Sequence, residues 1–197
     1  MTRFFLYYFC ILIVRFCRMI IHFFRYIVSR TNPRSYFVEP IDGDYNFLSS
    51  PLKTFNRIMS DDVVPSFDWF VDVGCGEGLV GVFVALFKRK RVMLHDHQVY
   101  LARVVRWLSW GLLIPRVMVS TRMCDAYPSK SVFFCVWTSW SLRNRQRVVD
   151  KLASVFPNDS MIVSVTHPVD HESFILVKKM DYLFAWGSAN VYYYKHA

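Results

Sequence analysis

The sequence predicts an α/β fold, a doubly wound, mostly parallel sheet with a C-terminal antiparallel strand pair, preceded by a separate hydrophobic and cationic helix. From residue 39 onward, short apolar runs alternate with amphipathic segments, which is typical of helices covering both faces of a parallel sheet. The 197 residues, 54% of them hydrophobic, suffice for one core. We expect an N-terminal membrane helix (1–28), a linker (29–38) and a single domain (39–197).

The apolar run over residues 4–28 is long enough, if helical, to cross a bilayer. Its four basic side chains, Arg15, Arg18, His22 and Arg25, fall on one narrow side of such a helix. This pattern favours a membrane anchor, either spanning or lying in an anionic surface. A cleaved organelle presequence and a helix packed on the domain or on a partner are the alternatives. Residues 29–35, with Pro33, break the pattern and begin the linker.

The domain elements follow in order along the chain. The predicted strands cover residues 67–73, 91–96, 116–120, 131–137 and 161–166, and the predicted helices cover 79–90, 98–111 and 141–156. Residues 173–196 form two β-rich runs joined around Trp186 and Gly187, which predicts the final antiparallel pair. The connection over residues 121–130 is too short for a full helix.

Charge and cysteine content narrow the function. Six arginines and no acidic residue lie in residues 1–38, so most of the net charge of +9 lies outside the domain, which argues only weakly for a nucleic-acid partner. The five cysteines form no C-x-x-C pair. A disulfide framework or a zinc site is therefore not expected, and a reducing compartment fits better.

A glycine-rich turn follows the first predicted strand of the domain. Its sequence, Asp72-Val73-Gly74-Cys75-Gly76-Glu77-Gly78, has the spacing G-x-G-x-G rather than the G-x-G-x-x-G of dinucleotide sites. Glycines allow a sharp turn and let a ligand approach the backbone closely. Two acids beside the turn would repel a pyrophosphate, whereas they suit a cationic cofactor without phosphates.

This turn resembles the first motif of the class I (seven-β-strand, Rossmann-like) S-adenosylmethionine-dependent methyltransferases. The resemblance implies that Asp96, with His97 beside it, ends the second strand and holds the ribose hydroxyls, and that Asp125-Ala126, after Cys124, lie near the adenine. It also implies S-adenosylmethionine as cofactor and an in-line attack by a nitrogen or oxygen acceptor on the sulfonium methyl. The predicted cofactor-binding residues are Asp72, Gly74, Cys75, Gly76, Gly78, Asp96, His97, Asp125 and Ala126.

A narrower resemblance concerns the acceptor. Residues 44–59 and 136–141 are similar to the segments that flank the acceptor channel of the non-SET protein-lysine methyltransferases, which implies that Tyr45, Trp137, Thr138 and Ser139 line that channel. A protein lysine is the preferred acceptor. An RNA or a small molecule is the alternative, and a catalytically inactive, membrane-tethered cofactor-binding scaffold is a further one.

Histidines cluster at the same predicted edge of the sheet. His95 and His97 flank Asp96, and His167 and His171 follow the fifth strand, so a metal is conceivable, but nothing fixes a third ligand. We therefore predict no metal, and His167 is an alternative general base. The expected location is a membrane, with the domain in a reducing compartment, either at the cytoplasmic face or inside an organelle such as a mitochondrion. The sequence does not indicate an oligomeric state.

Overall fold

The computed structural model describes residues 52–76, 78–96, 116–138, 140–184 and 187–197, all of which belong to the compact unit Asp42–Ala197. The predicted helices over 1–28 and 98–111 and the linker over 29–38 lie outside the described residues. So do Tyr45, His97 and Ser139. Within the described part, no helix has the length and apolar character needed to cross a bilayer.

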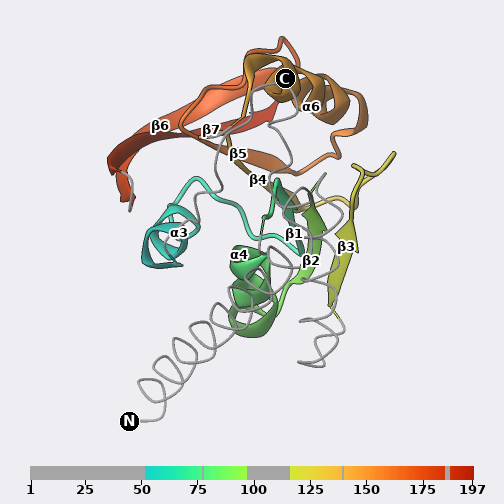
Figure 1. Cartoon of the computed structure of the whole chain (residues 1–197), viewed down its shortest axis with the longest axis vertical. Coiled ribbons are helices and arrows are strands. Elements are labelled where there is room, and N and C mark those ends of the chain that lie inside the picture. Colours follow the sequence, from blue (N-terminus) through green and yellow to red (C-terminus); the bar gives the residue numbers. More distant parts are fainter. Residues whose placement is uncertain (1–51, 77, 97–115, 139, 185–186) are drawn as a thin grey trace, which may run out of the picture. The chain divides into compact units, whose positions relative to one another are not determined.

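Seven strands form one sheet in the order β3-β2-β1-β4-β5-β7-β6 (Figure 1). The strands are β1 (Trp69–Val73), β2 (Arg91–His95), β3 (Val117–Ser120), β4 (Ser131–Val136), β5 (Met161–Val165), β6 (Phe174–Phe184) and β7 (Gly187–His196). β1 to β5 run parallel, and β7 is antiparallel to both β5 and β6. The predicted doubly wound sheet with a C-terminal antiparallel pair is confirmed.

The helices cover both faces of this sheet. They are α3 (Leu52–Ile58), α4 (Leu79–Phe83), which continues into the π-helical turn η2 (Val84–Lys88), and α6 (Leu142–Val155). α3 and α4 contribute to one buried cluster and α6 to the other. As expected, residues 121–130 contain no helix.

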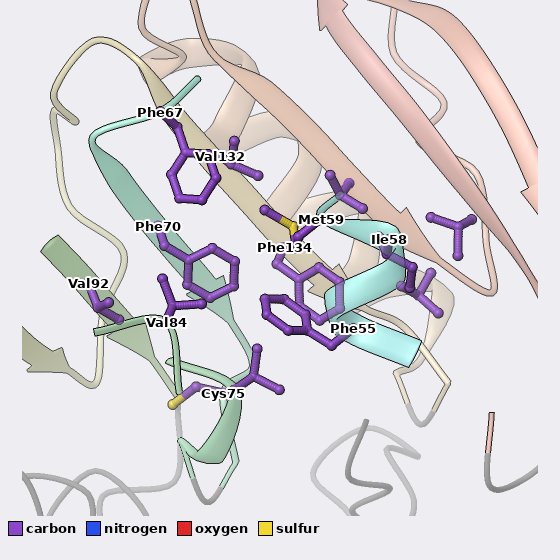
Figure 2. Close-up of a cluster of buried hydrophobic side chains, with 14 of the residues drawn as sticks. Phe55, Ile58, Met59, Phe67, Phe70, Cys75, Val84, Val92, Val132 and Phe134 are labelled. Carbon is purple, nitrogen blue, oxygen red and sulfur yellow. The ribbon is translucent and has the colours of Figure 1, made fainter. Parts of the chain in front are cut away.

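Side chains along the central strands point alternately to the two faces of the sheet and so form two cores. In β1 and β4, Phe70 and Phe134 face the cluster on the α3 side, whereas Val71 and Phe133 face the cluster on the α6 side. Figure 2 shows Phe55 of α3 beside both phenylalanines of the first cluster, and its ring meets theirs edge-on at centroid distances of 5.5 and 5.2 Å. α3 thereby packs against β1, which leads into the glycine turn, and against its neighbour β4.

Two helical features differ from the prediction. A single helix was expected over residues 79–90, but α4 ends at Phe83, and η2 ends before Arg89, which adopts a left-handed φ of 53°. Apolar spacing over so few residues does not distinguish an α-helix from a π-helix. The helix α3 was not predicted, although Thr54, Phe55 and Ile58 recur at helical spacing and are buried.

Candidate functional site

The glycine turn lies where the strand order reverses, between β1 and β4. In doubly wound sheets, ligands bind at this point, beyond the carboxyl ends of the strands. Gly74, Gly76 and Gly78 all have left-handed φ angles, of 79°, 53° and 68°. Side chains other than glycine rarely adopt these angles, so the local backbone explains all three glycines of the motif.

Backbone hydrogen bonds tie the turn to the end of β2. The amides of Gly74 and Cys75 both donate to the carbonyl oxygen of His95, at 2.7 and 2.9 Å. The amide of Gly76 donates to Oδ2 of Asp96 at 2.8 Å. The turn and the acid after β2, which are separated in the sequence, therefore form one rigid unit.

Two carboxylates are buried in this unit. Asp72 is 5% exposed and Asp96 is 8% exposed. Burial, and secondarily the charge of Asp96, raise the pKa of Asp72 to about 8. Within the part of the chain that the structure describes, the Asp72 side chain forms no hydrogen bond or ion pair. Such a group is costly to bury, and a cation next to it would offset that cost.

Cys75 is a packed thiol rather than a nucleophile. Its side chain is 8% exposed and belongs to the core cluster on the α3 side. Burial, and secondarily the nearby Asp72 and Asp96 charges, raise the pKa of the thiol well above its usual value. Because the thiolate is the reactive form, this position shapes the turn and does not attack a substrate.

The environment of Asp125 differs from that of the two buried acids. The Asp125 carboxylate is exposed and pairs with Lys151 of α6 at 2.7 Å, which lowers the pKa of Asp125. Its neighbours Cys124 and Ala126 are half-buried and exposed, respectively. The structure therefore brings Asp72 close to Asp96, whereas the cofactor-binding roles of these two acids and of Asp125 and Ala126 stay predictions.

Tyr127 fixes this loop and was not recognised in the sequence. Its hydroxyl accepts a hydrogen bond from the amide of Cys124 at 3.1 Å and bonds to Nε2 of His95 at the same distance. His95 is 4% exposed, and burial lowers its pKa to about 4, so the ring is neutral near pH 7. His95 and Tyr127 therefore connect the glycine turn to the loop after β3.

Of the two tryptophans after β4, Trp140 rather than Trp137 lies against the glycine turn. Trp137 is 1% exposed, and its Nε1 donates to Oγ of Ser164, so it is a core residue. The sequence analysis predicts that Trp137 lines an acceptor channel, whereas the structure buries its side chain in the core on the α6 side of the sheet. The indole of Trp140 packs edge-on against Trp137, and a Cβ added to Gly74 would lie 2.5 Å from Cζ2 of Trp140.

Polar groups follow β4 and β5 next to the tryptophan pair. The hydroxyls of Thr138 and Thr166 lie 3.3 Å apart and join the ends of the two strands. His167 is half-buried, and burial, followed by the positive charge of Arg145 on α6, lowers its pKa. His171 accepts from the amide of Ser173 through Nδ1. The described residues contain no group of three His, Cys, Asp or Glu side chains placed to hold a metal ion.

Comparisons with known proteins give the class of fold. No protein-family profile and no curated protein matches the sequence. The solved structures that match share the seven-stranded architecture of the class I S-adenosylmethionine-dependent methyltransferases. The chain therefore has the class I methyltransferase fold.

Three solved structures illustrate the similarity. A mutant of MtNAS in complex with S-adenosylmethionine is 15% identical, with a TM-score of 0.56, over 74% of this chain and 62% of that one. The putative methyltransferase yhhF from Escherichia coli is 14% identical, with a TM-score of 0.55, over 80% of this chain and 97% of that one. Coclaurine N-methyltransferase bound to N-methylheliamine and SAH is 12% identical, with a TM-score of 0.55, over 73% of this chain and 55% of that one.

Proposed function

We propose that this chain is an S-adenosylmethionine-dependent methyltransferase. The observation that carries the proposal is the Asp72 carboxyl, which is buried beside Asp96 at the glycine turn and forms no hydrogen bond with another residue that the structure describes. S-adenosylmethionine is a cation without phosphates, with a positive sulfonium and an ammonium group, and it suits two clustered acids. The complex of MtNAS with S-adenosylmethionine supports this choice of cofactor.

The residues of the turn have distinct roles in this proposal. The three left-handed glycines allow the cofactor to approach the backbone, and the Gly76 amide orients the Asp96 carboxylate toward the ribose hydroxyls. Asp72 balances the positive charge of the cofactor. The cofactor supplies the activated methyl group, and the protein contributes mainly by positioning the acceptor and excluding water.

We further propose that the acceptor is a protein lysine. A lysine amine must be neutral to attack, and a nearby positive charge favours the neutral form. Burial, and secondarily the charge of Arg145, lower the pKa of His167 after β5, and an amine placed at this edge would experience the same charge. Thr138, Thr166 and the Trp140 indole provide a hydroxyl and aromatic lining there.

A membrane location completes the proposal. Residues 4–28 combine an apolar run with a narrow row of basic side chains, which suits an anionic membrane surface. We propose that they tether the catalytic domain to a membrane in a reducing compartment. Protease protection of the tagged full chain in isolated membranes tests this, and recovery of the chain in the soluble fraction would refute it.

The activity test uses the purified full chain with methyl-labelled cofactor and a combined membrane and soluble extract. Label in protein, at lysine after hydrolysis, supports the proposed acceptor. Label in RNA or in small molecules replaces it with that class. Asp96→Ala and Gly76→Arg should abolish cofactor binding, whereas Asp150→Asn, at an exposed position of α6 that bonds to Gln146, should bind like the wild type.

The outcomes separate three cases. Cofactor binding with methyl transfer supports the enzyme. Cofactor binding without transfer to any fraction identifies an inactive scaffold. A folded chain that does not bind S-adenosylmethionine refutes the proposed cofactor.

A further inference from the structure

β6 is the last strand of the sheet, and its outer edge pairs with no strand within the described part of the chain (Figure 1). This edge strand is also long. It pairs with β7 from Phe174 to Phe184, whereas β5 pairs with β7 only between residues 162 and 165. Long open edges invite pairing with another strand, so proteins usually protect them. The β6 edge therefore needs a physical explanation.

The exposed side chains of β6 are unusually apolar for an edge strand. Five large apolar side chains have exposed fractions between 41% and 75%: Ile175, Leu176, Val177, Met180 and Leu183. Lysine is a common protective residue at such edges. Here, however, the Lys178 ammonium is held within the subunit by Asp61 and Asp62, at 2.8 and 2.9 Å. That lysine does not shield the edge.

We propose that two copies of this chain associate through β6, as antiparallel strands related by a two-fold axis at Met180. In an antiparallel pair, directly opposed residues have their side chains on the same face of the sheet. A two-fold axis perpendicular to the sheet must therefore place one residue of β6 opposite its own copy, because pairing a residue with its neighbour in the sequence would put the two side chains on opposite faces. This leaves Lys179, Met180 and Asp181 as the candidate centres in the middle of the strand.

Charge selects among these three registers. With the axis at Met180, Lys179 lies opposite Asp181 of the partner subunit, and symmetry repeats the pair. Centring on Lys179 or on Asp181 instead places two like charges opposite each other, which is destabilising. Both side chains are exposed, and the Lys179 ammonium lies over the ring of Tyr192, its neighbour on β7, on the same face of the sheet.

The same register also buries an apolar side chain at its centre. It places Met180 against Met180 of the partner subunit. The irregularity between Leu176 and Lys178 limits regular pairing to the residues that follow it. The result is one continuous sheet across two subunits, which removes both open edges. This proposal does not depend on the methyltransferase activity.

Disulfide formation tests the register in the full chain. Met180→Cys places a thiol at the axis, so mild oxidation should yield a covalent dimer well above the wild-type background from the native cysteines. Ile175→Cys is the matched control, because residue 175 is exposed on the same strand but lies far from its own copy in this register. Equal cross-linking of both variants, or of neither, would overturn the proposal.

A charge exchange tests the same register without cysteines. Lys179→Glu and Asp181→Lys each create two like-charged pairs across the interface, and each should raise the dimer dissociation constant about tenfold. The double exchange, Lys179→Glu with Asp181→Lys, should restore the wild-type value. Light scattering after size exclusion gives the mass of each variant, and thermal unfolding confirms that each is folded. A monomeric wild type, or a double variant no better than the single ones, contradicts β6 pairing.

Discussion

The Asp72 carboxyl should couple cofactor binding to pH. Its pKa is raised to about 8 in the free protein, and a cationic cofactor requires the ionised form. With this value, about ten molecules in eleven carry the proton at pH 7. Binding must release that proton, so affinity should increase as the pH rises toward 8. Affinity increases rather than decreases with pH because the positive charge of the cofactor lowers the pKa of the Asp72 carboxyl in the complex.

The size of the effect follows from the same pKa. If the pKa in the complex falls below 6, the apparent dissociation constant exceeds that of the ionised protein by about twofold at pH 8, elevenfold at pH 7 and a hundredfold at pH 6. Calorimetry in buffers of different ionisation enthalpy should detect about 0.9 proton released per cofactor bound at pH 7.

Asp72→Asn isolates the contribution of the carboxyl. This variant should bind more weakly than the wild type above pH 8, and it should lose the pH dependence that Asp72 causes. Any titration of the cofactor's own amino group remains in both proteins and cancels in the comparison. S-adenosylhomocysteine, which lacks the sulfonium charge, shows whether that charge or the ammonium acts on Asp72. Identical pH profiles for the wild type and Asp72→Asn would refute the assignment of this acid.

Three further predictions concern stability and the shape of the site. Without cofactor, Asp72→Asn should raise the melting temperature at pH 8 more than at pH 5, since the raised pKa of Asp72 makes the folded wild type lose about 5 kcal/mol of stability as the pH rises from 4 to 8. Gly74→Ala should abolish cofactor binding and lower the free energy of unfolding by about 1–3 kcal/mol, through its left-handed φ and the contact with Trp140; adding Trp140→Ala should recover only part of that loss. Tyr127→Phe should cost about 1–3 kcal/mol in chemical denaturation, because His95 and a loop amide lose their shared partner, and it should also weaken cofactor binding.

The sequence predicted the sheet well because its central strands are buried on both faces. Runs such as residues 131–136 and 161–165 have few alternatives to a buried parallel strand. The proximity of Asp72 to Asp96 was also predictable, since Asp72 lies near the carboxyl end of β1 and Asp96 follows the neighbouring parallel strand β2, so both lie at one edge of the sheet. In these cases local pattern and topology together determine the position of a side chain.

Loops and strand ends were harder to predict. The direction of the Asp125 side chain depends on Lys151, which is distant in sequence, and the contacts of Tyr127 with His95 are similarly remote. The burial of Trp137, by contrast, had a signal. It continues the alternation of Phe133 and Cys135, both of which face α6.

The site is also where the sequence departs most from what folding alone would favour. A carboxyl at position 72 sits among buried apolar residues of β1, where an amide or an apolar side chain would cost less. The neighbouring turn needs three glycines in left-handed conformations, which increases the entropy lost on folding. A bound cation would offset the cost of burying the Asp72 carboxyl, and a ligand that approaches the backbone closely would explain the three glycines. Both features therefore point to the same cofactor. A purely structural turn would account for the glycines but leave the buried carboxyl of Asp72 unexplained.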